Sequence, residues 1–235
     1  MDVIVLAGGL GTRLRNVIND RPKPMALING KPFLYYIFCW LEKQNIERII
    51  LSVGYKSEII KDYFGDKLKN MKILYVMEDK PLGTGGAILQ SLCKSNKSPV
   101  FVVNGDTFFP ISLKNLEKFH RENNALISLA LKHIKKQSRY GTVVLNNKNK
   151  IMKFEEKKYV NSGLINGGIY LINKEFFIEK YGVKKVFSIE RDVFEKDTID
   201  NQLYGKVCSE KFVDIGLPQD YFKIMHDKVF FSKYE

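Results

Sequence analysis

The sequence predicts an α/β fold with a doubly wound, mostly parallel mixed sheet in a single domain. The chain opens with a continuous apolar run, Val3-Ile4-Val5-Leu6, that ends in glycines, as a strand buried on both faces does. Similar runs alternate with helical patterns as far as residue 106, which indicates βαβ units. The 235 residues are 45% hydrophobic and 27% charged, which suits one ordered globular domain.

The first 124 residues carry the pattern of a parallel sheet. A proline fits the first turn of a helix that begins at Pro32, and apolar side chains at positions 87, 88, 89 and 92 follow the period of a helix. The predicted strands are residues 3–6, 49–53, 73–77 and 100–103. The predicted helices are residues 32–44, 56–64 and 85–93.

From residue 125 onward, strands follow one another through short connections, which predicts a more mixed second half. No linker separates the two halves, so we expect one domain over residues 1–235. The predicted strands are residues 125–132, 141–145, 151–155, 169–172, 204–208 and 212–215. The predicted helices are residues 174–180, 186–195 and 218–229.

The composition restricts the partners. The formal net charge is +12, from 38 Lys and Arg against 26 Asp and Glu, but the lysines are scattered and form no basic tail. This distribution predicts a solvated lysine-rich surface, suits small anionic substrates and argues against nucleic acid. No apolar stretch approaches the roughly 18 residues of a membrane span, and the N-terminus lacks a signal-peptide pattern. With three widely spaced cysteines, we expect no disulfide framework or zinc site and a soluble, reduced, cytoplasmic protein.

A glycine-rich turn, LAGGLGTRL, follows the first strand over residues 6–14. Glycines here let backbone N–H groups approach an anion, and Arg13 adds a guanidinium that suits phosphate oxygens. A dinucleotide fingerprint would need glycine where Leu14 stands, and the Gly-Lys-Ser/Thr of a Walker A motif is missing. The alternative is a tight strand-to-helix turn that binds nothing.

Lys23 lies between two prolines in the segment Arg21-Pro22-Lys23-Pro24. Each proline ring fixes its own φ and holds the residue before it extended. The segment therefore predicts a lysine mounted on stiff backbone, which suits the positioning of a charge on a phosphate. A surface lysine without a ligand is the alternative.

These segments resemble the sugar-1-phosphate nucleotidyltransferases. The matching motifs are LAGGLGTRL (6–14), RPKPM (21–25), PLGTGGA (81–87), NGD (104–106), YGTV (140–143), EEK (155–157), NGGIY (166–170) and DIGLPQDY (214–221). The resemblance implies a Rossmann-like fold of the nucleotide-diphospho-sugar transferase type, Mg²⁺ as cofactor, and conversion of NTP and sugar 1-phosphate to NDP-sugar and pyrophosphate. It also implies that residues 1–124 mainly bind the nucleotide and residues 125–235 mainly bind the sugar phosphate.

We expect Lys23, Arg13 and Asp106 to be catalytic. Asp106 ends a buried strand, where open α/β sheets bind their ligands. In the family, the aspartates that match Asp106 and Asp214 share the metal; an aspartate at a strand end is otherwise often only a helix cap. The predicted nucleotide-binding residues are Leu6, Ala7, Gly8, Gly9, Gly11, Thr12, Arg13, Lys23, Glu78, Pro81, Gly83, Thr84 and Gly105.

The resemblance also implies a sugar-phosphate site. In the family, the residues that match Glu156 and Lys157 contact the sugar hydroxyls and the phosphate. The motif here is EEKKY rather than EEKP, so Glu155 is a competing assignment. Many relatives carry threonine where this chain has Leu217, a departure with little expected effect on the metal. The further predicted sugar-phosphate residues are Tyr140, Gly141, Asn166 and Gly168.

Two segments favour particular substrates. Glu78 favours guanine, because a carboxylate accepts from both N1–H and N2–H₂, whereas pyrimidine sites more often use an amide side chain. Residues 188–194 resemble a segment of the bacterial heptose-1-phosphate guanylyltransferase branch, although Ser188 also suits a helix cap. We therefore expect GTP and D-glycero-α-D-manno-heptose 1-phosphate as substrates, giving GDP-heptose for a capsule or surface polysaccharide. Mannose 1-phosphate is the nearest alternative, and other NTPs come next.

Two other classes of protein share parts of this pattern. A non-catalytic sensor of nucleotides or sugar phosphates could lose the metal carboxylates, but Lys23, Asp106 and Asp214 are all present. A glycosyltransferase also carries metal aspartates at a strand end, but the LAGGLGTRL turn suits a triphosphate. The expected partners are GTP and a sugar 1-phosphate, with no nucleic acid and no membrane, and a homodimer is possible.

Overall fold

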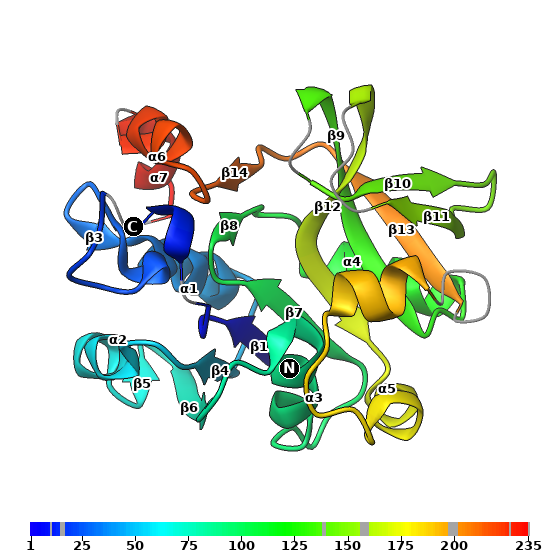
Figure 1. Ribbon diagram of the computed structural model, residues 1–235, viewed down its shortest axis with the longest axis horizontal. Helices are drawn as coiled ribbons and strands as arrows, with labels where there is room; N and C mark the ends of the chain where they lie inside the picture. Colours follow the sequence, from blue (N-terminus) through cyan, green and yellow to red (C-terminus); the bar gives the residue numbers. More distant parts are fainter. Residues whose placement is uncertain are drawn as a thin grey trace.

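A ten-stranded mixed sheet forms the centre of the molecule (Figure 1). The computed structural model describes residues 1–9, 11–14, 17–137, 140–155, 160–196, 202–225 and 227–234. The strands follow the order β11-β10-β12-β7-β1-β4-β6-β5, while β9 pairs with β12 and β13 pairs with β9. The prediction of a doubly wound α/β fold with a mixed sheet is confirmed.

The parallel part of the sheet has β1 at its centre. β1 (Asp2–Leu6) pairs in parallel with β4 (Arg48–Val53) on one side and with β7 (Val100–Asn104) on the other. β6 (Met71–Met77) continues the sheet beyond β4. The connections from β1 therefore leave in opposite directions, and such a switch point opens a crevice at the carboxyl ends of the strands.

The strand β12 (Val160–Ile172) joins the parallel part of the sheet to the second half of the chain. It pairs antiparallel with β7 and with β9 (Ile127–Gln137), and its register against β9 shifts between Asn166 and Tyr170. This shift is a β-bulge, a feature that often lies next to a functional site. The sheet continues with β10 (Thr142–Leu145), β11 (Ile151–Glu155) and β13 (Leu203–Cys208), at the upper right of Figure 1.

Alternate side chains of β1 enter two separate cores. Val3 and Val5 belong to the core on one face of the sheet, and Ile4 belongs to the core on the other. Both faces of β1 are thus buried, which explains its continuous apolar run. The first core is covered by α1 (Phe33–Lys43), α2 (Ser57–Phe64), α4 (Leu113–Glu122), α6 (Pro218–Met225) and α7 (Lys228–Ser232). The second core is covered by α3 (Gly83–Leu92), α5 (Lys174–Tyr181) and the short helix η3 (Glu190–Glu195).

Several short elements complete the chain. They are η1 (Thr12–Leu14), η2 (Lys23–Met25), β2 (Leu27–Ile28), β3 (Lys31–Pro32), β5 (Lys67–Leu68), β8 (Thr107–Phe108) and β14 (Val213–Asp214). None of the helices in the described ranges is long and apolar enough to cross a membrane.

Two predicted helices are wrong in their extent. The helix predicted over residues 186–195 is a single wide turn over Glu190–Glu195, because the residues before it form backbone hydrogen bonds with α3 instead. The helix predicted over residues 218–229 is two helices, because the side chain of Asp227 accepts from the N–H of Phe230 and caps a new one. The helix α4 was not predicted.

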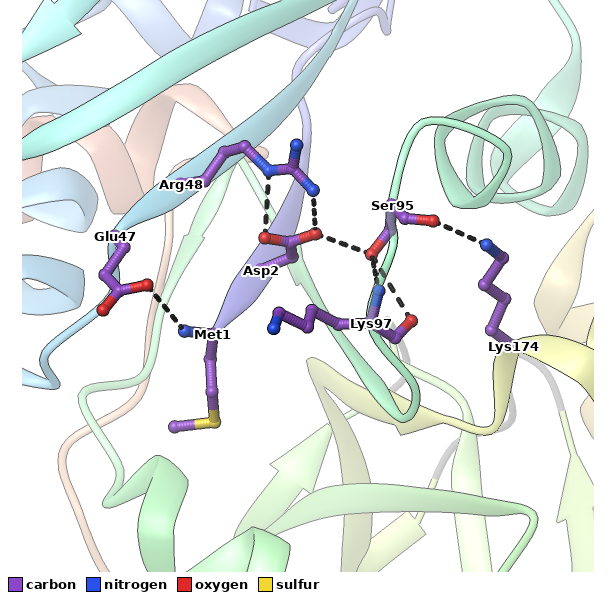
Figure 2. A network of polar contacts seen from close by, with 7 residues as sticks. All are labelled: Met1, Asp2, Glu47, Arg48, Ser95, Lys97 and Lys174. Carbon is purple, nitrogen blue, oxygen red and sulfur yellow. Dashed lines mark hydrogen bonds and ion pairs between the residues drawn. The ribbon is translucent and has the colours of Figure 1, made fainter.

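The amino end of β1 is held by a buried carboxylate, shown in Figure 2. Arg48 donates to both oxygens of Asp2, and the hydroxyl of Ser95 donates to Asp2 Oδ2 at 2.7 Å. Burial alone would raise the pKa of Asp2, but the hydrogen bonds from Arg48 and Ser95 and the charge of Arg48 outweigh it. The pKa of Asp2 is therefore lower than its ordinary value of 3.8.

Replacing Asp2 by asparagine is expected to lower the free energy of unfolding by about 1–3 kcal/mol at pH 7, because the Arg48 guanidinium loses its anionic partner. A lowered pKa contributes stability above the unfolded value and loses it as pH falls through the folded value. The difference between variant and wild type should therefore shrink below about pH 4, as urea unfolding at several pH values would measure. Glu47→Gln, at an exposed pair with the N-terminus, is the control and should leave the unfolding midpoint unchanged.

Candidate nucleotide site

A cavity of about 360 Å³ lies at the carboxyl ends of β1 and β7, where the switch point of the sheet is. Every predicted nucleotide-binding residue except Gly105 lines it. Four further residues that were not predicted also line it, namely Pro24, Ala87, Asn104 and Gly216. The predicted nucleotide residues therefore come together in one place, although they come from three distant segments.

Backbone contacts fix the glycine-rich turn after β1. The N–H of Ala7 donates to the carbonyl of Ser52 in β4 at 2.7 Å, and the N–H of Leu14 closes η1 on Gly11 at 3.0 Å. Gly11 has a φ of 58°, and a Cβ there would lie 2.9 Å from the Cβ of Lys23. Glycine is thus needed for the turn to lie directly against Lys23.

The ammonium of Lys23 lies between two carboxylates. Its Nζ is 2.6 Å from Asp106 Oδ2 and 3.9 Å from Asp214 Oδ1. Pro22 is extended, with φ of −70° and ψ of 153°, and the N–H of Ala26 closes η2 by donating to the carbonyl of Lys23. The side chain of Lys23 is only 13% exposed, so the segment holds a cation in a largely buried position.

A short strand pair brings the two aspartates together. Thr107 in β8 pairs with Asp214 in β14, and the N–H of Ile215 donates to the carbonyl of Asp106 at 3.2 Å. Burial raises the pKa of Asp214, the carboxylate of Asp106 raises it further, and Lys23 lowers it. The two carboxylates repel each other, so a cation placed between them stabilises both in the charged form.

The donor set at Asp106 and Asp214 fits Mg²⁺, which in nucleotide sites takes one or two carboxylates and completes its shell with phosphate oxygens and water. Lys23 already stands between them as a positive group. Within the described ranges, no group of three or more His, Cys, Asp or Glu side chains could hold a metal without such help. A metal at this position would therefore depend on a bound phosphate.

Glu78 lies against the glycine-rich turn. The buried hydroxyl of Ser52 donates to Glu78 Oε1 at 2.9 Å, and the N–H of Leu82 donates to Oε2 at 3.3 Å. A Cβ on Gly8 would collide with Oε1, so a larger residue there would displace this carboxylate from its present position. Both oxygens are fixed and each keeps capacity to accept a further hydrogen bond.

The bulge of β12 lies beside the cavity. The side chain of Asn166 accepts from the N–H of Gly168 at 2.9 Å, and the N–H of Asn166 donates to the carbonyl of Gly141 at 3.1 Å. A Cβ on Gly168 would lie 2.9 Å from Asn104 Nδ2, and Asn104 lines the cavity. Asn166, Gly168 and Gly141 therefore form a neighbouring surface rather than part of the cavity wall.

Of the remaining predicted sugar-phosphate residues, only Tyr140 lies within the described residues. Tyr140 hydrogen-bonds Asp214, and this contact lowers the pKa of Asp214. Glu156 and Lys157 lie outside the described residues. The competing residue Glu155 ends β11 and pairs with Lys153 at 2.9 Å.

Two residues of the NGD motif, Gly105 and Asn104, differ from the prediction in whether they line the cavity. Gly105 does not line the cavity, because its N–H donates to the carbonyl of Leu6 at 2.9 Å and a Cβ there would lie 2.6 Å from that oxygen. It instead lets the chain after β7 pass close to β1. Asn104, which was not selected, carries a buried Oδ1 with no hydrogen-bond partner among the described residues. An unpaired buried acceptor indicates a place for a ligand or water.

Comparisons with known proteins identify the family of the chain. The family model described as nucleotidyl transferase matches residues 2–229. The chain is 45% identical over 223 residues to a D-glycero-alpha-D-manno-heptose 1-phosphate guanylyltransferase of Aneurinibacillus thermoaerophilus, which covers 95% of this chain and 96% of the relative. It is 46% identical over 227 residues to the enzyme of the same name from Campylobacter jejuni, with coverage of 96% and 99%.

A solved structure is similar to this chain in both fold and sequence. The crystal structure of HddC from Yersinia pseudotuberculosis complexed with GMP-PN has a TM-score of 0.85 and 37% identity, and covers 96% of this chain and 98% of its own. The predicted family and its nucleotide-sugar transferase type of fold are confirmed. On the match over nearly the whole sequence and the relatives above 40% identity, the chain belongs to the nucleotidyl transferase family.

Proposed function

We propose that the protein transfers GMP from GTP to D-glycero-α-D-manno-heptose 1-phosphate, forming GDP-heptose and pyrophosphate. The observation that carries the proposal is that the glycine-rich turn, Lys23 and Asp106 line one cavity. Such a cavity suits a triphosphate, and relatives at 45% and 46% identity are named for this reaction. The product would be used for a capsule or surface polysaccharide.

The reaction brings two polyanions together. An oxygen of the sugar phosphate attacks the α-phosphorus of GTP, and the bond to the β-phosphate oxygen breaks, so that pyrophosphate leaves. Positioning and charge neutralisation supply most of the catalysis in such a step. The amides of the glycine-rich turn and Arg13 hold the triphosphate, and Lys23 neutralises the α-phosphate while charge develops on it.

Asp106 and Asp214 are the residues that would hold Mg²⁺. When bound, the ion would neutralise phosphate charge and orient the phosphate oxygens. Asp106 also keeps Lys23 in place through the 2.6 Å ion pair, and the hydrogen bond from Tyr140 orients Asp214.

Glu78 would select the base. Ser52 and the Leu82 N–H fix its two oxygens, which leaves two adjacent acceptors for the N1–H and N2–H₂ of guanine. The carboxylate of Glu78 lies beside Gly8, so it stands next to the turn that would hold the phosphates.

The sugar phosphate would lie on the neighbouring surface. Gly141, Asn166 and Gly168 are next to the cavity through Asn104, and Tyr140 reaches Asp214. With Glu156 and Lys157, these residues form the proposed sugar-phosphate site. Residues 1–124 would then mainly bind the nucleotide and residues 125–235 the sugar phosphate, although Asp214 and Gly216 come from the second part and reach the nucleotide side. We place the enzyme in the cytoplasm, and a homodimer stays a prediction.

We expect pyrophosphate release to be fastest with GTP and heptose 1-phosphate in a matrix of four NTPs against heptose, mannose and glucose 1-phosphates. A guanine site that pairs both donors with Glu78 should favour GTP by about tenfold or more over UTP and dTTP. Glu78→Gln, which supplies only one acceptor, should reduce that preference. Faster turnover with UTP or dTTP would contradict the assignment of the base, and faster turnover with mannose 1-phosphate would contradict the assignment of the sugar.

A further inference from the structure

The segment before η3 crosses the first turn of α3. The carbonyl of Phe187 accepts from the N–H groups of Gly85 at 3.0 Å and Gly86 at 3.4 Å, and the N–H of Phe187 donates to the carbonyl of Leu82 at 3.0 Å. A Cβ on Gly86 would lie 2.7 Å from the carbonyl oxygen of Lys185. The glycines of the PLGTGG turn are thus required by this crossing, which brings the second half of the chain against one wall of the cavity.

Glu190, on η3, is joined to that wall through one threonine. Its Oε2 accepts from the hydroxyl of Thr84 at 2.7 Å and from the hydroxyl of Ser188 at 2.7 Å. The N–H of Ile189 donates back to Thr84 Oγ1 at 3.0 Å. Thr84 lines the cavity, whereas Glu190 does not. The hydrogen bond to Thr84 therefore links Glu190 directly to the cavity wall.

These contacts determine what the threonine can offer to a ligand. A hydroxyl has one proton to donate and two lone pairs that accept. The proton of Thr84 points to Glu190, since a carboxylate oxygen only accepts, and one lone pair is taken by the N–H of Ile189. The remaining lone pair is an acceptor.

We propose that Glu190 is a positioning residue that makes the Thr84 hydroxyl an acceptor toward the cavity and thereby favours guanine over adenine. The N2–H₂ of guanine has a second proton besides the one paired with Glu78, and it can be donated to Thr84, whereas adenine carries no amine at this position. Glu78 presents two acceptors to the same cavity, so Thr84 and Glu78 have matching polarity. This inference rests on the proposed use of GTP and adds to it a residue outside the cavity.

The test is the ratio of kcat/KM for GTP to that for ATP in Glu190→Gln. The glutamine amide can donate to Thr84 Oγ1, which frees the threonine proton to point into the cavity. A single hydrogen bond of changed polarity should lower the ratio by about tenfold, mainly through a higher KM for GTP. Thr84→Val removes the hydroxyl at similar volume and should lower the ratio to a similar extent. In the double variant, Glu190→Gln should have no further effect, because its influence passes through Thr84.

Asp192→Asn is the matched control. Asp192 accepts from the N–H of Ser188 at 2.9 Å and pairs with Lys196 at 2.8 Å, so it supports the same turn without touching Thr84. Its GTP-to-ATP ratio should equal that of the wild type, whatever the change in melting temperature.

Three results would overturn the inference while leaving the use of GTP intact. The first is an unchanged ratio in Glu190→Gln or, where that variant does not fold, in Thr84→Val. The second is an equal fall of the ratio in Asp192→Asn, which would show that loosening of the turn is enough. The third is a further fall when Glu190→Gln is added to Thr84→Val. A wild-type enzyme with no preference for GTP over ATP would instead contradict the proposed function itself.

Discussion

Replacing Lys23 by alanine is expected to lower kcat by about 10²- to 10³-fold, the usual loss when one group that stabilises transition-state charge is removed. Lys23 is the cation between Asp106 and Asp214, and it lines the cavity proposed for the triphosphate. Without it, the phosphates would approach two carboxylates with less positive charge in between. Pyrophosphate release at saturating GTP and sugar phosphate measures the effect.

The control for Lys23→Ala is Lys72→Ala, which removes an exposed lysine from β6. Lys72→Ala should keep the wild-type kcat, since the overall positive charge is not what drives the reaction. Near-normal turnover in Lys23→Ala, with a folded protein by circular dichroism, would reject the assignment of Lys23.

Asp106→Asn is expected to lower kcat by at least about 100-fold and to raise the Mg²⁺ concentration needed for half-maximal rate. An amide keeps the shape of the side chain but loses the charge that holds both Lys23 and a metal. Asp214→Asn should shift the Mg²⁺ requirement in the same direction, because the two carboxylates face one position through the β8–β14 pair. Titration of the rate with Mg²⁺ separates this effect from a loss of GTP binding.

Asp62→Asn, at an exposed position of α2, is the control for the two aspartate variants and should show the wild-type Mg²⁺ dependence. An unchanged Mg²⁺ dependence in both Asp106→Asn and Asp214→Asn would contradict a metal at this pair. A loss of activity that excess Mg²⁺ does not restore, together with normal Mg²⁺ affinity, would assign Asp106 to the positioning of Lys23 alone.

The parallel part of the fold could be predicted because its strands are apolar on both faces. β1, β4 and β7 lie within a residue or two of the predicted ranges. The turn after β1 and the segment with Lys23 could also be predicted, since glycines and prolines act on the backbone locally. These local signals account for most of the cavity wall.

Contacts between distant segments could not be predicted in the same way. The periodicity of residues 186–195 fits a helix, but hydrogen bonds from Phe187 to α3 keep the first residues of that range out of it. Three residues of the PLGTGG turn were predicted to bind the nucleotide and do line the cavity, but the role of its glycines in making room for that crossing could not be predicted. The missed helix α4 did carry a signal, because Ser112 caps it by accepting from the N–H of Asn115.

Because β14 pairs with β8, the proposed site is complete only after a late segment of the chain has been made. Asp214 belongs to a segment that leaves the ribosome long after the turn at β1 and the lysine at position 23. A chain in which β14 has not yet docked on β8 therefore lacks one of the two carboxylates beside Lys23. Only molecules with β14 in place would present the complete cluster of Lys23, Asp106 and Asp214 to a ligand.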